Sequence, residues 1–64
     1  MVTINGKQVN ANGVKLVDYL NENDFDINRI AVEINEFIIP REDCKNVVLK
    51  DGDIVELVSF VAGG

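Results

Sequence analysis

The fold of this chain is decided near its amino terminus, where two short segments flank an Asn-Gly pair in the run Val2-Thr3-Ile4-Asn5-Gly6-Lys7-Gln8-Val9-Asn10. Apolar and polar residues alternate on both sides of the pair, which is the period of a strand with one buried face. Asn-Gly suits a two-residue turn in which both positions adopt a positive φ. The run therefore predicts a β-hairpin as the first two elements.

A helix is expected after the break at Asn12-Gly13. Apolar residues recur there at helical spacing, namely Leu16, Val17, Tyr19 and Leu20. The spacing predicts one amphipathic helix from about Lys15 to Glu22, with its end at Asn23-Asp24. An acidic group accompanies it, consisting of Asp18, Glu22, Asp24 and Asp26. This group is interpreted as a solvated face, and a docking surface for a basic partner is the alternative.

The second half of the chain predicts further short strands. Ile30–Ile34 is rich in β-formers and precedes an Asn35-Glu36 turn, and Phe37–Ile39 is a second strand closed by Pro40, which cannot donate to a ladder. Residues 41–46 are expected to be irregular or a single helical turn. Residues 47–49 form either a short strand or a packed connector.

A tight turn is predicted at Lys50-Asp51-Gly52-Asp53, where Gly52 suits a left-handed position. The last predicted strand follows this turn and runs from Ile54 to about Ser59. One helix across a mixed sheet of four to five strands buries both apolar surfaces, which makes the fold class α+β. A right-handed crossover would place the last strand parallel to the first. The expected core consists of Ile4, Leu16, Leu20, Val32, Ile34, Val55 and Leu57.

Composition narrows the classes of function. The chain has 64 residues, which is one small domain, and its net charge of −5 disfavours binding to nucleic acid. It has no His and a single Cys44, so neither a metal site nor a Ser-His or Cys-His nucleophile is expected. No apolar run has membrane-spanning length and no secretory pattern opens the chain, so a soluble, cytoplasmic protein is expected. Such a chain presents a group to other proteins rather than transforming a substrate itself.

The carboxyl end is the candidate functional segment, and it reads Phe60-Val61-Ala62-Gly63-Gly64. Two residues without Cβ can enter a narrow channel, and five extended residues reach about 16 Å. The Gly64 carboxylate is therefore the candidate reactive group, carried on a flexible tail over residues 60–64 of a single domain. The alternative interpretation is a frayed end or a remnant of cloning. Phe60 and Val61 continue the apolar alternation and are expected to be buried by a partner.

The order of elements and several local motifs resemble the ThiS family of sulfur carriers, which has the ubiquitin-like β-grasp fold. The matching motifs are Glu33-Ile34-Asn35-x-x-Ile38-x-Pro40-Arg41, Leu49-x-Asp51-Gly52-Asp53 and Phe60-Val61-Ala62-Gly63-Gly64. Each motif is weak alone, and all of them in this order over the whole chain are specific. One departure is Cys44, where the family usually has Trp. We interpret Cys44 as a small residue in a partly buried place, with a sulfur-transfer thiol as the alternative.

The resemblance implies a specific chemistry. A separate ThiF-type enzyme would adenylate the Gly64 carboxylate with ATP, a persulfide-bearing donor would supply sulfur, and the resulting thiocarboxylate would serve thiazole synthase in thiamin biosynthesis. The chain would then be no enzyme and bind no cofactor, because ATP is used by the activating partner. Gly63 and Ala62 would thread the tail, and Phe60, Val61 and Arg41 would contact partners, although a surface ion pair is the simpler role for Arg41.

Two other functions remain open from the sequence. One is a sulfur carrier of the molybdopterin-synthase small-subunit type, which shares the fold and the tail. The other is a ubiquitin-like binding module that docks by its sheet and uses no tail chemistry.

Overall fold

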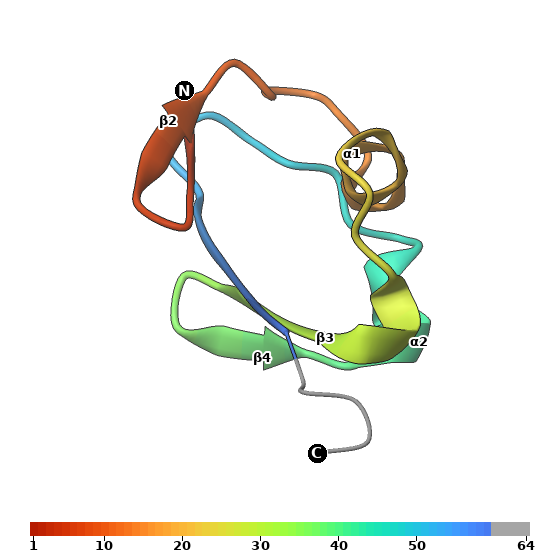
Figure 1. Ribbon diagram of the computed structural model, residues 1–64. Coiled ribbons are helices and arrows are strands. Elements are labelled where there is room, and N and C mark those ends of the chain that lie inside the picture. Colours follow the sequence, from red (N-terminus) through yellow and green to blue (C-terminus); the bar gives the residue numbers. More distant parts are fainter. Residues whose placement is uncertain (60–64) are drawn as a thin grey trace.

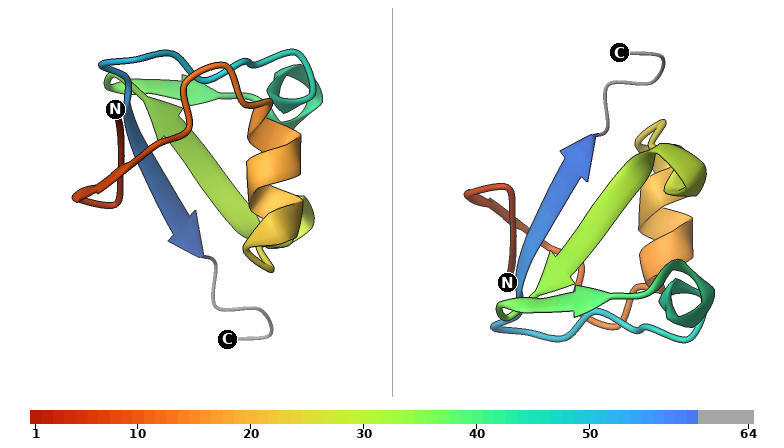
Figure 2. Two further views of the ribbon diagram at one scale, coloured as in Figure 1. Left: turned by 90° about the horizontal axis from the view of Figure 1, so that it is seen from above. Right: turned by 90° about the horizontal axis from the view of Figure 1, so that it is seen from below.

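The computed structural model describes residues 1–59 and contains one five-stranded sheet in the order β2-β1-β5-β3-β4. The strands are β1 (Val2–Ile4), β2 (Lys7–Val9), β3 (Ile30–Ile34), β4 (Phe37–Ile39) and β5 (Ile54–Ser59). Helix α1 (Leu16–Glu22) covers one face of the sheet, and β3 and β5 lie side by side beneath it (Figures 1 and 2). The α+β architecture expected from the sequence is confirmed.

Both hairpins form where the sequence predicts them, and each turn begins with an asparagine at a positive φ. Asn5 and Gly6 have φ values of 51° and 82°, as a two-residue turn requires. The second turn has no glycine, and Asn35 and Glu36 take φ values of 52° and 73° instead. Asn tolerates this left-handed region because its short side chain can hydrogen-bond locally.

The central strand joins the two hairpins. β5 pairs in parallel with β1, through Thr3 opposite Ile54 and Ile4 opposite Val55, and its residues Val55 to Ser59 pair antiparallel with β3. The expected parallel placement of the last strand beside the first is therefore confirmed. It follows that β5 lies between β1 and β3 at its start and is paired with β3 alone at its end.

The connecting segments settle the alternatives left by the sequence. Residues 41–46 include the short helix α2 (Arg41–Cys44), which contacts β3. Residues 47–49 are a packed connector rather than a strand, and their only ladder contact among the described residues is an isolated bridge from Val48 to Lys15. A short 3-10 helix, η1 (Ile27–Arg29), was not predicted; the Asp26 side chain caps it by accepting from the Asn28 N–H at 2.9 Å.

The core lies between α1 and the sheet. Of the predicted core residues, all are buried except Ile34, which is half-buried. Five further residues are buried that the prediction did not include, namely Val2, Ala11, Ile30, Cys44 and Leu49. Leu49 is 0 % exposed although it lies outside any helix or strand, so the connector contributes to the core directly.

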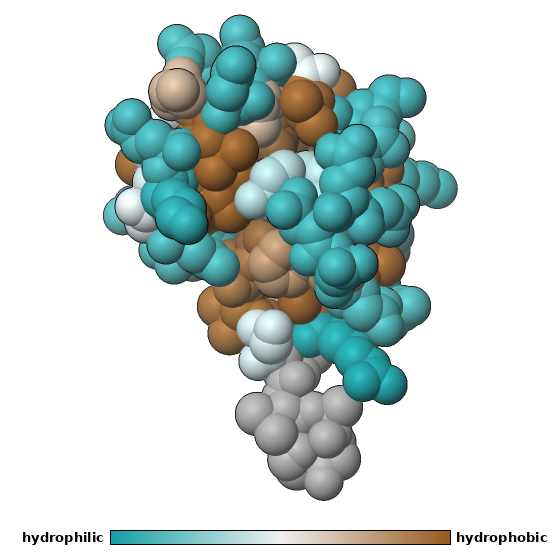
Figure 3. Space-filling model, turned by 45° about the horizontal axis from the view of Figure 1, so that its top comes forward, coloured by the Kyte–Doolittle hydropathy of each residue, from teal (hydrophilic) through white to brown (hydrophobic). Residues whose placement is uncertain are grey.

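Apolar side chains also reach the surface. On the face drawn in Figure 3, a hydrophobic strip lies between two hydrophilic areas. Over the described residues, the exposed large hydrophobic side chains are Met1, Phe37, Ile38, Val48, Ile54 and Val58. Neither helix within residues 1–59 has the length and apolar character that crossing a bilayer requires.

Candidate functional site

The candidate site begins at the end of β5, the strand that leads into the carboxyl-terminal segment. Ser59 is the last described residue, and it lies opposite Ile30 at the start of β3. β1 pairs with the start of β5, at Ile54 and Val55, and β3 pairs with β5 from Val55 to Ser59, so hydrogen bonds from both sides set the backbone only in the first part of the strand. The base of the predicted tail therefore starts at Ser59, where β5 is paired on one side, by β3.

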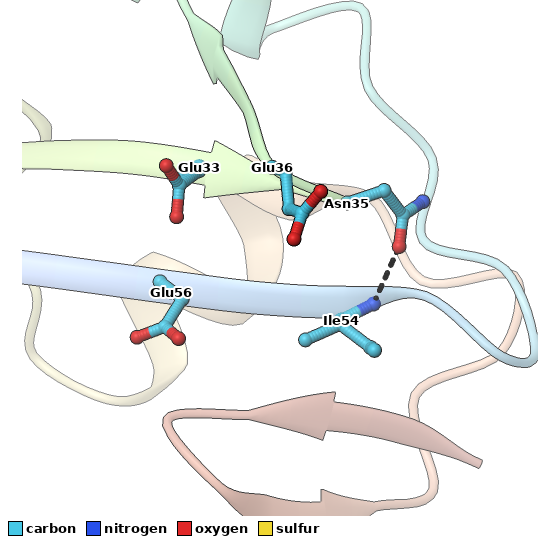
Figure 4. A pocket seen from close by; sticks show the side chains of 5 residues that line it. All are labelled: Glu33, Asn35, Glu36, Ile54 and Glu56. Carbon is cyan, nitrogen blue, oxygen red and sulfur yellow. Dashed lines mark hydrogen bonds between the residues drawn. The ribbon is translucent and has the colours of Figure 1, made fainter.

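Two asparagine side chains extend the hydrogen bonding of β5 beyond its ladders. The Asn5 Oδ1 accepts from the Leu57 N–H at 2.7 Å, past the last β1 residue that pairs with β5. At the other end of the strand, the Asn35 Oδ1 accepts from the Ile54 N–H at 3.0 Å (Figure 4). Both asparagines belong to hairpin turns, so each turn also fixes the central strand.

The sequence assigns the reactive tail to the last five residues of the chain. Phe60, Val61, Ala62, Gly63 and Gly64 lie outside the described residues. Their proposed roles in carrying, threading and docking the reactive group stay predictions.

Arg41 lies at the end of the sheet from which the tail continues. Its Nη1 donates to the Asn28 Oδ1 at 2.7 Å, and Asn28 belongs to η1, directly before the start of β3 where Ser59 pairs. The expectation of a surface ion pair for Arg41 is wrong for residues 1–59, where its hydrogen-bond partner is neutral. The Asn28 amide of η1 occupies the position of that partner. Among residues 1–59, no carboxylate forms an ion pair with the Arg41 side chain.

A shallow hollow of about 210 Å³ lies at the same end of the molecule. Its lining includes the apolar side chains of Ile27, Ala31 and Ile38 and the polar groups of Asn28 and Arg41. Apolar walls with one cation at the rim are suited to a protein segment that carries an apolar side chain and an acid.

A second hollow, of about 340 Å³, is acidic and was missed by the sequence reasoning as a site. It is lined by Glu33 of β3, Glu36 of the following turn, Glu56 of β5, Asn35 and Ile54 (Figure 4). Strand alternation already assigns Glu33 and Glu56 a common direction. Only the register, which places these two residues directly opposite each other, shows that they are neighbours.

The remaining candidate residues have structural roles. Cys44 is 1 % exposed within the core, and burial, followed by the nearby charge of Asp43, raises the pKa of its thiol. A buried, protonated thiol is a poor nucleophile, which favours the small-hydrophobe interpretation. Asp53 accepts from the Lys50 N–H at 2.9 Å, as expected of turn chemistry, and Asp51 pairs with the amino terminus. Residues 1–59 hold no group of His, Cys, Asp or Glu that could bind a metal ion.

Comparison with known proteins gives a consistent result. A sequence model of the ThiS family matches residues 2–64. The crystal structure of a thiamine biosynthesis protein (ThiS) from Geobacter metallireducens superposes with a TM-score of 0.76 at 30 % identity, covering 98 % of this chain and 97 % of that one. The solution structure of a thiamine biosynthesis protein from the same organism gives a TM-score of 0.73, also at 30 % identity, with 98 % and 86 % covered.

Curated relatives of different lengths also match. The chain is 36 % identical to part of a thiazole synthase from Paramagnetospirillum magneticum, covering 98 % of this chain but only 20 % of that protein. It is also 36 % identical to an uncharacterised protein, ycf40, of Porphyra purpurea, of which it covers 90 %. The chain thus spans about a fifth of the synthase and nearly all of the small relative.

Proposed function

This chain belongs to the ThiS family of sulfur carriers in thiamin biosynthesis, with their ubiquitin-like β-grasp fold, and on that premise we propose that its Gly64 carboxylate carries the sulfur as a thiocarboxylate. The observation that supports the proposal is the placement of β5. β3 pairs with this strand as far as Ser59, β1 pairs with its start, and two asparagine side chains hold it at Ile54 and Leu57. A rigid base can deliver a slim tail to a fixed point in a partner enzyme.

The proposed chemistry proceeds in two steps. A carboxylate is a poor acyl donor, so a ThiF-type enzyme first joins it to the α-phosphate of ATP with release of pyrophosphate. In the second step the terminal sulfur of a persulfide-bearing donor displaces AMP and forms an acyl disulfide, and a thiol then reduces its S–S bond, which leaves the thiocarboxylate and a disulfide. Thiazole synthase is the proposed acceptor of that sulfur, in agreement with the matching segment in one protein of that name. ATP is thus a substrate of the partner and not a cofactor of this chain.

In this proposal the catalytic groups belong to the partner enzymes, and the chain provides a folded body and a tail. The described residues provide a folded body that a partner can recognise, and Gly63 and Ala62 provide a segment thin enough for an active-site channel. Phe60, Val61 and Arg41 are the proposed contacts beside the channel entrance.

Intact-protein mass spectrometry tests the proposal directly. The full chain is incubated with the activating enzyme, ATP and a persulfide donor, and the expected product has one oxygen replaced by sulfur at Gly64. A variant that lacks Gly63-Gly64 is the control and should gain no sulfur. If the full chain also gains none, the carrier chemistry is wrong. If the truncated chain keeps its cellular function, the chain acts as a binding module without tail chemistry, and the carrier function is wrong.

A further inference from the structure

Strand β4 ends the sheet on one side and has a free outer edge. The strand order places it last, with β3 as its neighbour (Figure 1). Its sequence, Phe37-Ile38-Ile39, contains no charged residue. Native proteins usually protect such an edge with charges, a bulge or a covering element, because its N–H and C=O groups attract another strand. The protection of β4 consists of its shortness and of Pro40, which follows it.

The two most exposed large hydrophobic side chains of residues 1–59 belong to this strand. Phe37 is 73 % exposed and Ile38 is 75 % exposed. Because they are adjacent on one strand, they point to opposite faces of the sheet. A protein that docks on either face would cover only one of them, whereas a strand added along the edge covers both. Their joint exposure therefore favours pairing at the edge over a contact with one face.

The backbone of Ile38 is oriented for such a pairing. The Asn35 N–H donates to the Ile54 carbonyl oxygen at 2.8 Å, in register with the β3–β5 ladder. Since the bonding direction alternates along a strand, Ile34 faces the other way and bonds to Phe37 of β4. Ile38, the next residue of β4, therefore directs its own N–H and C=O away from β3 and toward the free edge.

A second copy of this chain supplies a matching edge. When two β4 strands pair antiparallel with their Ile38 residues opposite each other, these residues exchange both N–H···O bonds. Phe37 then lies opposite Ile39 of the second copy on one face of the joined sheet. The two Ile38 side chains meet on the other face. The pairing is symmetric about a two-fold axis, the commonest arrangement of identical subunits.

The charges at the two ends of β4 suit this symmetry. Glu36 precedes the strand and Arg41 follows it, and both residues are exposed. Counted outward from the centre, Glu36 lies opposite Pro40 of the second copy and thus beside its Arg41, and the two-fold axis repeats this contact. Within residues 1–59, the ion pairs include neither Glu36 nor Arg41. The antiparallel pairing therefore joins unlike charges, whereas a parallel pairing in register would join like ones.

We propose that two copies of this chain associate through β4, in an antiparallel pairing centred on Ile38 that joins their sheets into one. The two β5 strands then run in opposite directions, so each Ser59 stays at its own end of the joined sheet. The association is independent of the proposed sulfur chemistry. A pairing through so short a strand is weak, so we expect it at high protein concentration.

Sedimentation equilibrium of the full chain, from about 10 μM to about 1 mM, tests the pairing. The wild type should change from monomer to dimer within this range. Glu36→Arg should weaken the dimer about tenfold or more, because it brings like charges together at both contacts. The same substitution changes the net charge from −5 to −3, since a charge of −1 becomes +1, and this alone would favour association. The matched control is Glu22→Arg, with the same net charge, which should associate at least as strongly as the wild type.

A mixture of two variants tests the proposed register. Arg41→Glu alone should also weaken the dimer, because the new acid would face Glu36 of the second copy. Mixed in equal amounts with Glu36→Arg, it should restore the dimer, since both contacts again join unlike charges. Restoration would also show that both variants are folded. The control mixture is Glu22→Arg with Lys7→Glu, on α1 and on the opposite edge strand β2, and mixing should add nothing to the association of the separate variants.

The apolar variants separate an edge contact from a contact with one face. Phe37→Ser and Ile38→Ser should each weaken the dimer several-fold, and Val48→Ser, at an exposed position of the connector, should not. If only one of the two β4 variants weakens it, the copies meet through a face and the proposal is wrong. It is also wrong if the wild type stays monomeric at about 1 mM, if Glu36→Arg associates like Glu22→Arg, or if the mixture restores nothing.

Discussion

Asn5 holds the backbone of Leu57 with both ends of its side-chain amide. Its Oδ1 accepts from the Leu57 N–H at 2.7 Å, and its Nδ2 donates to the Leu57 carbonyl oxygen at 3.3 Å. The amide thereby replaces the next residue that a longer β1 would have supplied. A turn residue of the first hairpin thus fixes the strand that leads to the carboxyl end, across 52 positions of sequence.

Replacing Asn5 should therefore cost more than a turn residue normally does. Asn5→Ala removes both hydrogen bonds and places a Cβ-bearing residue at a φ of 51°, for an expected loss of about 2–3 kcal/mol in the free energy of unfolding. Asn5→Gly keeps the backbone conformation and should lose about 1–2 kcal/mol. Urea denaturation measures both. Equal stability of the Ala and Gly variants would show that the backbone conformation contributes nothing.

The role of Asn5 also shows what the sequence could and could not predict. Local patterns located both hairpins, α1 and the final strand, because period and turn chemistry are properties of neighbouring residues. The bond from Asn5 to Leu57 and the Glu33–Glu56 pair depend on register between distant strands, which no local pattern contains. The burial of Leu49 was missed for the same reason: a residue in a loop joins the core through tertiary packing alone.

The connector makes a second prediction. Leu49 is fully buried and Val48, its neighbour, is 44 % exposed. Leu49→Ala should lower the free energy of unfolding by about 2–5 kcal/mol, since it leaves a cavity in the core. Val48→Ala is the control and should lose less than about 1 kcal/mol. Thermal or urea unfolding of the two variants decides whether this irregular segment belongs to the cooperative core.

Cys44 predicts a dependence of stability on alkaline pH. Burial and Asp43 raise the pKa of its thiol above the ordinary value of 9.0. As the pH rises, the unfolded chain therefore loses the thiol proton before the folded chain does. The contribution of the buried thiol to the free energy of unfolding is complete below pH 9.0 and decreases as the pH rises above that value. Relative to Cys44→Ala, the wild type should become less stable through that range. Parallel stability curves for the two proteins between neutral and alkaline pH would contradict the assignment.

The same burial predicts the reactivity of the thiol. In the folded protein at neutral pH, Cys44 should react with a thiol reagent such as dithionitrobenzoate only as fast as the structure opens. The reaction should become fast in urea. Rapid modification of the native protein would instead support the sulfur-transfer role that the sequence left as an alternative.

Arg41 provides the last prediction, because its charge and its hydrogen bond can be removed separately. Arg41→Ala removes both, whereas Asn28→Ala removes the acceptor at 2.7 Å and leaves the cation in place. Since the contact is exposed, each variant should lose no more than about 1 kcal/mol of stability. If the cation acts on a partner beside the tail, sulfur loading at limiting activating enzyme should be several-fold slower for Arg41→Ala and nearly unchanged for Asn28→Ala.

Arg41→Lys should recover most of the rate if charge alone matters, and little of it if a bidentate contact does. Equal loading rates in Arg41→Ala and the wild type would remove Arg41 from the partner surface and leave it as a positioning residue for η1.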